Sequence, residues 1–307
     1  MSLAVSPTPS QDYDTAFVTA SDGLKLHVRV WGRPDTDALP VICLPGLSRT
    51  AEDFDALASH LAAQRRVLAL DYRGRGASEH DRNPLNYNVA VELADVIAVA
   101  TALEAMPAVY VGTSRGGILT MLLAAARPTL IAGAVLNDIG PVIEPKGLLR
   151  IKSYVGKLPE PRTLEEGAEI LRRLFSAQFP RLTAGDWLEA ARRQWRDVNG
   201  RLALTYDARL SETLHDVDPE RPLPDMWAQF DALGGVPLMA IRGANSDILS
   251  AGVLKTMKSR HKHMEAIEVA DQGHPPLLSE ADIVRRIAAF VARCRAGLDL
   301  KPAAISV

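Results

Sequence analysis

The sequence predicts an α/β protein with a mostly parallel sheet. Short apolar runs typical of buried strands alternate along the chain with longer amphipathic runs typical of helices. One apolar strand, at residues 108–111, passes into a helix at 118–126 through the pentapeptide Gly112-Thr113-Ser114-Arg115-Gly116. With 307 residues, 47% of them hydrophobic, the chain is long enough for a large core. Such alternation places the active site outside the carboxyl ends of the parallel strands.

The chain is expected to begin with a disordered tail over residues 1–14, which is rich in serine and proline. Strand patterns at 16–19 and 24–31 flank a turn at Ser21-Asp22-Gly23, which predicts an antiparallel hairpin. Together with six later strands that alternate with helices, this hairpin predicts eight strands in all. The later strands are expected at 41–44, 67–70, 108–111, 131–139, 236–242 and 264–269.

Several helix starts carry the capping-box pattern, a hydroxyl residue followed three positions later by an acid. These starts are Thr50 with Asp53, Thr163 with Glu166, Thr183 with Asp186, and Ser279 with Asp282. Further helices are expected at 89–103 and 225–233, and from Ser250 to about 260.

Strand and helix stop alternating between residues 142 and 225, where the pattern predicts mostly helices and loops. This helical insertion divides the core into residues 15–141 and 226–296, and a tail follows over 297–307. Within the insertion, Trp187, Leu188, Ala191 and Trp195 fall on one helical face. Packing against the core explains such a stripe. Lining of a substrate pocket by Trp187 and Trp195 is the alternative.

Composition excludes several classes of function. A formal net charge of −2 gives no electrostatic reason to expect nucleic acid or an anionic membrane as a partner. No apolar run is long enough to span a bilayer, and the N-terminus lacks a signal-peptide pattern. Cys43 and Cys294 match no metal-ligand spacing and are expected to be buried free thiols, which suit a reducing compartment. We therefore expect a cytoplasmic protein without a metal; the sequence does not indicate its oligomeric state.

Three residues with complementary chemistry, Ser114, Asp247 and His274, each follow a predicted strand. A serine hydroxyl becomes a good nucleophile when an imidazole takes its proton, and a carboxylate on the far ring nitrogen fixes the tautomer. Asp138, at the end of the preceding strand, is the alternative acid, and Asp271 is expected to be a loop carboxylate. The other histidines are expected to face solvent: His27, His60, His80, His215, His261 and His263.

Five motifs resemble those of the α/β-hydrolases, over about residues 15–296. They are Leu44-Pro45-Gly46-Leu47, the Asp71-to-Gly76 turn, the Ser114 pentapeptide, the Arg242-to-Asp247 segment and Gln272-Gly273-His274. The resemblance implies the α/β-hydrolase fold, with an eight-stranded, mostly parallel sheet flanked by helices and a helical cap over 142–225, inserted after the sixth strand. It further implies a serine nucleophile, no cofactor, and an oxyanion hole formed by the backbone N–H groups of Leu47 and Arg115. Some relatives place the triad acid at the position of Asp138.

The expected activity is hydrolysis of a small-molecule carboxylic ester through an acyl-enzyme. A carbon–carbon bond or lactone hydrolase using the same triad, and a hydrolase-like small-molecule receptor, are the alternatives. Arg115, directly after the nucleophile, replaces the Met, Gln or Leu common in relatives. It either favours a carboxylate-bearing or oxygen-rich acyl group or is held in an ion pair. Arg73 and Arg75 are expected to pair with nearby carboxylates.

Overall fold

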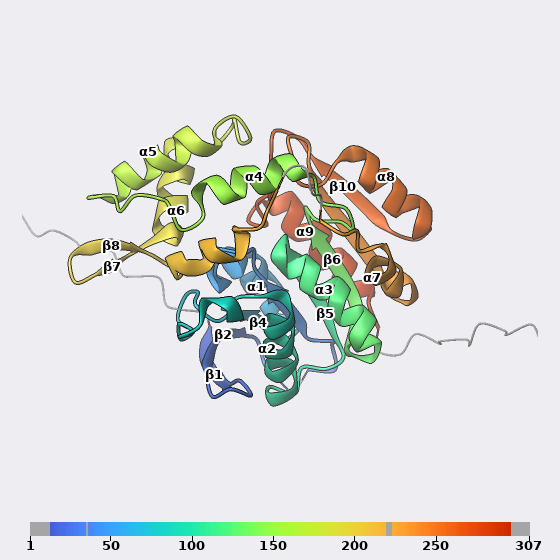
Figure 1. The fold of residues 1–307 in the computed structure, drawn as a ribbon. Coiled ribbons are helices and arrows are strands. Elements are labelled where there is room, and N and C mark those ends of the chain that lie inside the picture. The colour runs from blue at the N-terminus through green and yellow to red at the C-terminus, as the bar shows by residue number, and fades with distance from the viewer. Residues whose placement is uncertain (1–12, 35, 219–222, 296–307) are drawn as a thin grey trace, which may run out of the picture.

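The computed structural model describes residues 13–34, 36–218 and 223–295 (Figure 1). The tail expected over 297–307 lies outside the described residues. Of the tail expected over 1–14, residues 1–12 also lie outside them. Asp14 already belongs to the first strand, and the ring of Tyr13 lies 5.1 Å from that of Trp31. No helix within the described ranges is long and apolar enough to cross a membrane.

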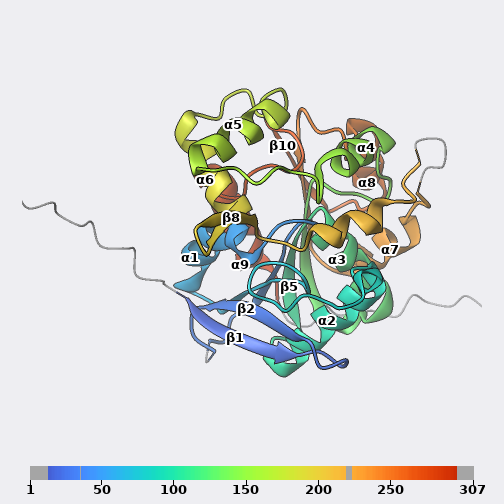
Figure 2. The ribbon, with the colours of Figure 1, turned by 60° about the vertical axis from the view of Figure 1, so that its left-hand side comes forward.

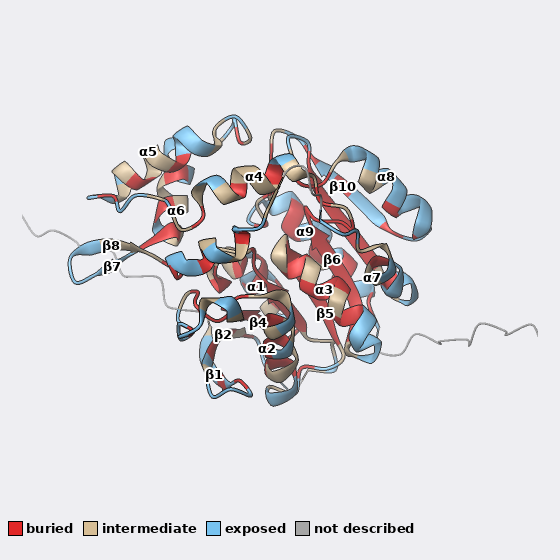
Figure 3. Ribbon diagram, viewed as in Figure 1, coloured by how far each residue is buried: buried red, intermediate tan, exposed pale blue. Residues whose placement is uncertain are grey.

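The main sheet has eight strands in the order β1-β2-β4-β3-β5-β6-β9-β10. Its strands are β1 (Asp14–Thr19), β2 (Lys25–Trp31), β3 (Val41–Leu44), β4 (Val67–Leu70), β5 (Ala108–Thr113), β6 (Ile131–Asn137), β9 (Leu238–Gly243) and β10 (Glu265–Val269). The pairs β1–β2 and β2–β4 are antiparallel and the remaining pairs are parallel. Every residue of the five central strands is buried, because helices cover both faces of the sheet (Figure 3). The predicted fold class is confirmed.

Two apolar layers hold the helices to the sheet. Successive residues of β3 alternate between them: Val41 and Cys43 face one layer, whereas Ile42 and Leu44 face the other. The first layer packs against α1 (Asp55–Ala62) and α9 (Ala281–Arg293). The second packs against α2 (Val89–Ala102), α3 (Arg115–Ala126), α7 (Trp227–Asp231) and α8 (Ala251–Arg260). Cys43 and Cys294 are buried free thiols in the first layer, as predicted.

Two of the predicted helix caps are present. Thr183 begins α6 (Ala184–Gln194) with a complete capping box to Asp186. Thr163 begins α5 (Leu164–Phe175), and its hydroxyl accepts the N–H of Glu166. Both starts lie on the surface, where the local sequence alone decides the cap.

The caps predicted at Thr50 and Ser279 are wrong. Thr50 precedes a 3₁₀ helix, η1 (Ala51–Phe54), without a side-chain cap bond, and α9 begins after Glu280. At Thr50 other partners bind the groups at the start of the helix: the Ala51 N–H donates to Asp71 at 2.7 Å, and the Asp53 side chain pairs with Arg49. Other short 3₁₀ helices are η2 (Pro84–Asn86), η3 (Pro128–Leu130), η4 (Ala208–Leu214) and η5 (Ala232–Gly235).

The segment between β6 and α7 lies beyond the carboxyl ends of the strands (Figures 1 and 2). It contains α4 (Pro145–Tyr154), α5, α6 and a hairpin of β7 (Trp195–Val198) and β8 (Arg201–Leu204). The hairpin was not predicted: its strands are short, and Asn199 and Gly200 turn it with φ of 55° and 80°. The Gly76 N–H donates to Thr205 and the Asp207 N–H to Gly74, both at 2.7 Å, which fastens this segment to the core.

Candidate active site

Ser114 occupies a sharp turn between β5 and α3. Its φ of 50° and ψ of −108° are strained for a residue with a side chain. The Ser114 N–H donates to Asn137 O at 3.0 Å, which holds the turn in place. A Cβ on Gly112 would lie 2.5 Å from the Gly116 carbonyl, and a Cβ on Gly116 would lie 2.0 Å from Leu44 O. Both glycines of the pentapeptide are therefore required by close backbone approach.

A chain of hydrogen bonds links Ser114 to a histidine and a carboxylate. His274 Nε2 lies 2.9 Å from Ser114 Oγ, and His274 Nδ1 lies 2.8 Å from Asp138 Oδ2. His274 is in the loop after β10, and Asp138 directly follows β6. The three side chains therefore meet at the carboxyl end of the sheet in the order that general-base activation of a serine requires.

Asp138 is fully buried and held on both oxygens. Its Oδ1 accepts the Gly243 N–H at 2.8 Å, and its Oδ2 accepts the Ser246 hydroxyl at 2.5 Å as well as facing His274. Both donors come from the end of β9 and the loop after it. This fixed carboxylate holds the His274 ring with Nε2 directed at Ser114.

The prediction that Asp247 faces His274 is wrong. The Asp247 carboxylate forms a bidentate ion pair with Arg150 of α4, at 2.6 and 2.8 Å. Burial would raise the pKa of Asp247, but Arg150 holds it below its usual value. Asp247 therefore ties α4 to the core, and the alternative acid, Asp138, takes the place beside His274.

Two of the histidines expected at the surface are buried. His27 Nδ1 lies 2.7 Å from Asp71 Oδ2, and His261 Nε2 lies 3.2 Å from Val236 O. Neither faces Ser114, so both are structural. The other four are exposed as predicted: His60, His80, His215 and His263.

The two predicted oxyanion donors belong to chain segments next to Ser114. Arg115 is the first residue of α3, where backbone N–H groups have no partner within the helix. Leu47 follows Gly46, and a Cβ on Gly46 would lie 3.9 Å from Ser114 Cβ. The loop after β3 therefore approaches the nucleophile closely, and donation by these two N–H groups stays a prediction.

Three arginines near the site, Arg73, Arg75 and Arg115, are held by carboxylates. Arg115 Nε lies 2.6 Å from Glu92 Oε2, so its side chain is in an ion pair. Arg75 pairs with the same carboxylate at 2.8 Å. Arg73 pairs with three acids, which are Asp22, Asp81 and Asp95. The pairing predicted for Arg73 and Arg75 is confirmed.

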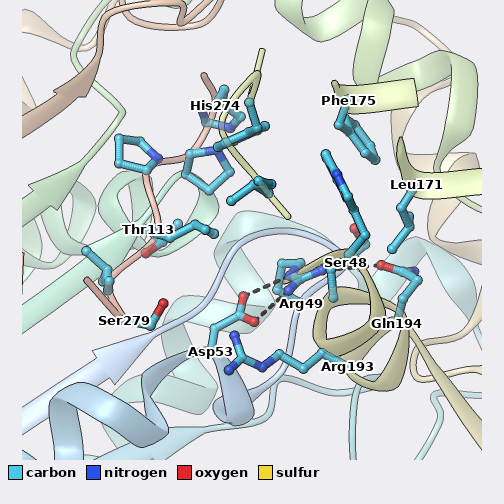
Figure 4. A pocket seen from close by; sticks show the side chains of 18 of the residues that line it. Ser48, Arg49, Asp53, Thr113, Leu171, Phe175, Arg193, Gln194, His274 and Ser279 are labelled. Carbon is cyan, nitrogen blue, oxygen red and sulfur yellow. Dashed lines mark hydrogen bonds and ion pairs between the residues drawn. The ribbon is translucent and has the colours of Figure 1, made fainter. Parts of the chain in front are cut away.

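A cavity of about 150 Å³ lies between the core and the inserted helices, with His274 in its wall (Figure 4). Apolar side chains from residues 142–225 line one part of it: Leu158, Leu171, Phe175, Phe179, Leu182 and Trp187. Leu277 and Leu278, which follow His274, add to the apolar wall from the core. Polar residues also line the cavity, among them Ser48, Arg49, Asp53, Arg193 and Gln194. In Figure 4, Arg49 is held between Asp53 and Gln194.

The two tryptophans predicted to line a pocket lie in different surroundings. Trp187 lines the cavity, whereas Trp195 is not among its lining residues and is buried against Gly167. Helix α6 ends at Gln194, and Trp195 is already extended, with φ of −126° and ψ of 144°. The helical face that joined the two residues in the sequence pattern therefore stops one residue too early, and the pocket prediction for Trp195 is wrong.

Comparison with known proteins identifies the family of the chain. Residues 41–287 match the family model described as "Alpha/beta hydrolase family". The 3-hydroxybutyrate-oligomer hydrolase of Cupriavidus necator is 34% identical over 253 residues, which are 80% of this chain and 85% of that protein. A pimeloyl-[acyl-carrier protein] methyl ester esterase of Stenotrophomonas maltophilia is 27% identical, over 84% of this chain and 93% of that protein.

Among solved structures, an alpha/beta hydrolase from Novosphingobium aromaticivorans superposes with a TM-score of 0.86. It is 39% identical, and the alignment covers 92% of this chain and 99% of that one. The chain therefore belongs to the α/β-hydrolase family.

Proposed function

We propose that this protein is a serine hydrolase that cleaves carboxylic esters through an acyl-enzyme. The observation that carries the proposal is the hydrogen-bonded chain from Asp138 through His274 to Ser114, with contacts of 2.8 and 2.9 Å at a strained strand-to-helix turn. The 3-hydroxybutyrate-oligomer hydrolase and the methyl ester esterase among its relatives support ester hydrolysis.

In the proposed mechanism, Ser114 Oγ attacks the ester carbonyl carbon while His274 Nε2 takes the hydroxyl proton. The tetrahedral intermediate collapses, the C–O bond to the alcohol breaks, and His274 returns the proton to the leaving alcohol. Water then attacks the acyl-enzyme with His274 again as base, releasing the acid and free Ser114. The N–H groups of Leu47 and Arg115 donate to the oxyanion, and the N-terminus of α3 adds its dipole.

The cavity favours a small acyl or alcohol group. A cavity of roughly 150 Å³ holds a molecule of about the size of benzene, so a chain of four to six heavy atoms fills it. Apolar side chains of α5 and α6, among them Leu171, Phe175 and Trp187, line it. Esters of short acids are therefore expected to react better than esters of long fatty acids.

A short oligoester that ends in a free carboxylate is a second candidate substrate. Arg49 is neutralised by a bidentate bond to Asp53. Arg193 also lines the cavity. Among the described residues no carboxylate lies within ion-pair distance of it, and its positive charge acts on Asp55 only through space, opposing the rise that burial causes in the pKa of that carboxyl. A cation in this position suits a substrate carboxylate. The relative named 3-hydroxybutyrate-oligomer hydrolase supports this substrate class.

Steady-state kinetics of active-site and cavity variants test both parts of the proposal. Ser114→Ala is expected to lower turnover of p-nitrophenyl butyrate by about 10⁴-fold or more, and retention of turnover contradicts the serine mechanism. For the second candidate, 3-hydroxybutyrate dimer is compared with its methyl ester. Arg193→Gln is expected to raise KM for the acid only, while the control Arg192→Gln, at an exposed residue paired with Glu189, changes neither. Equal effects of Arg193→Gln on acid and methyl ester contradict the carboxylate site.

A further inference from the structure

The loop after β3 is held through three consecutive carbonyl groups. Pro45 O accepts from the Tyr72 hydroxyl at 3.2 Å, Gly46 O from the Arg49 N–H at 3.2 Å, and Leu47 O from Arg75 Nε at 2.9 Å. In a planar trans peptide unit the C=O and the N–H point in opposite directions. Bonds to the carbonyls of Gly46 and Leu47 therefore also fix the directions of the N–H groups of Leu47 and Ser48.

A buried ion-pair bridge connects this loop to the residue after the nucleophile. Arg75, which holds Leu47 O, lies 2.8 Å from Glu92 Oε1, and Arg115 Nε lies 2.6 Å from Glu92 Oε2. Arg115 also donates to Tyr87 O at 3.1 Å. Arg75 and Glu92 are completely buried. One carboxylate on α2 thus joins the two chain segments from which the oxyanion donors are expected.

The bridge is charged as well as rigid. Two guanidinium groups share one carboxylate, which leaves a formal charge of +1 behind the turn that presents Ser114. Burial would raise the pKa of Glu92, but Arg75 and Arg115 hold it below its usual value, so the carboxylate is ionised at neutral pH. The Arg75 guanidinium also lies 5.5 and 5.4 Å from the ring centroids of Tyr72 and Tyr87, which restrict its position.

We propose that Glu92 is a positioning residue for the oxyanion hole: by binding Arg75 and Arg115 together, it sets the spacing between the Leu47 loop and the start of α3. The inference rests on the proposed serine mechanism. It assigns Glu92 no contact with substrate. Glu92 is expected to stabilise the transition state and not the bound substrate, because the donors that it positions bind the charge that develops on the carbonyl oxygen.

The test is steady-state kinetics of Glu92→Gln on p-nitrophenyl butyrate, with the melting temperature measured in parallel. Loss of one oxyanion donor costs roughly 10²–10³ in kcat, so displacement of donors that remain present is expected to lower kcat about 10- to 100-fold. KM is expected to stay within about threefold, because substrate binding in the ground state does not use the oxyanion.

Asp95→Asn is the matched control. Asp95 lies three positions further along α2, is buried, and is paired with the buried Arg73, but it contacts neither Leu47 nor Arg115. Its substitution is expected to lower the melting temperature while kcat stays within about threefold of the parent. A loss of kcat in both variants that follows their loss of stability would overturn the positioning role.

Further outcomes separate the inference from the function on which it rests. A parent protein without Ser114-dependent ester turnover contradicts the proposed function. An active parent whose Glu92→Gln variant keeps kcat within threefold contradicts the inference alone. If Glu92→Gln does not fold, Arg115→Gln takes its place, because the Arg115 side chain is partly exposed and its removal opens the bridge from the solvent side. It is expected to lower kcat about three- to tenfold at constant KM, and an unchanged kcat overturns the inference.

Discussion

Replacing Asp138 with asparagine is expected to reverse the hydrogen bonding at His274. Asp138 Oδ1 accepts the Gly243 N–H, a backbone donor that needs an acceptor, so the asparagine amide oxygen takes that position. The amide NH₂ then occupies the place of Oδ2 and points at His274 Nδ1. A donor there holds the ring with its proton on Nε2, where it cannot take the proton of Ser114.

Asp138→Asn is expected to lower kcat strongly. Loss of tautomer control at a serine triad lowers kcat about 10⁴-fold, and we expect between 10³- and 10⁴-fold here. The fold is expected to survive, because aspartate and asparagine have nearly the same shape. Asp247→Asn removes an ion pair to Arg150 and no contact of His274, so kcat is expected to stay within about tenfold.

The assay is kcat and KM for p-nitrophenyl butyrate over about pH 6 to 9, with melting temperatures as a check on folding. The ratio of kcat in Asp138→Asn to kcat in Asp247→Asn decides which carboxylate acts on His274. If Asp247→Asn proves the more damaging substitution, or if Asp138→Asn keeps kcat within tenfold of the parent, the argument from the amide orientation is refuted.

Further substitutions test the cavity and the connection of the insertion to the core. Trp187→Ala is expected to raise kcat/KM for octanoate esters relative to butyrate esters, because it enlarges the cavity. Trp195→Ala is expected to lower the melting temperature and to leave that kcat/KM ratio unchanged. Equal octanoate-to-butyrate ratios in the two variants contradict the assignment of Trp187 to the cavity. Burial would raise the pKa of Asp207, but bonds from Arg209 and Tyr87 lower it to about 2, so its contribution to stability is present above pH ~4 and is lost as pH falls toward 2. The unfolding free energy of Asp207→Asn is expected to lie about 1–2 kcal/mol below the parent at pH 7, with a smaller gap at pH 3; a gap independent of pH in urea titrations would be evidence against this linkage.

The features predictable from the sequence are those that depend on neighbouring residues. Central strands such as β5 are continuous apolar runs because both faces of the sheet are covered. The turn at Ser114 is marked by Gly112 and Gly116, since close backbone approach leaves no room for a side chain. The surface cap at Thr183 also follows from its own short sequence.

The features that could not be predicted depend on partners far away in the chain. Asp138 and Asp247 both follow strands, and the choice between them is made by Arg150, 97 positions from Asp247. His27 resembles a surface residue in the strand pattern, yet Asp71 is buried beside it. Trp195 matches the face of α6, but the helix ends before it because the chain turns into the β7–β8 hairpin.

Labelling with a fluorophosphonate, followed by peptide mapping, tests the central claim most directly. The reagent reacts with a serine that a neighbouring base activates, and here His274 Nε2 lies 2.9 Å from Ser114 Oγ. We expect a single adduct per chain on the peptide that contains Ser114, slow labelling of His274→Ala and none of Ser114→Ala. An adduct on another residue, or undiminished labelling of Ser114→Ala, would contradict the assignment of Ser114 as the nucleophile.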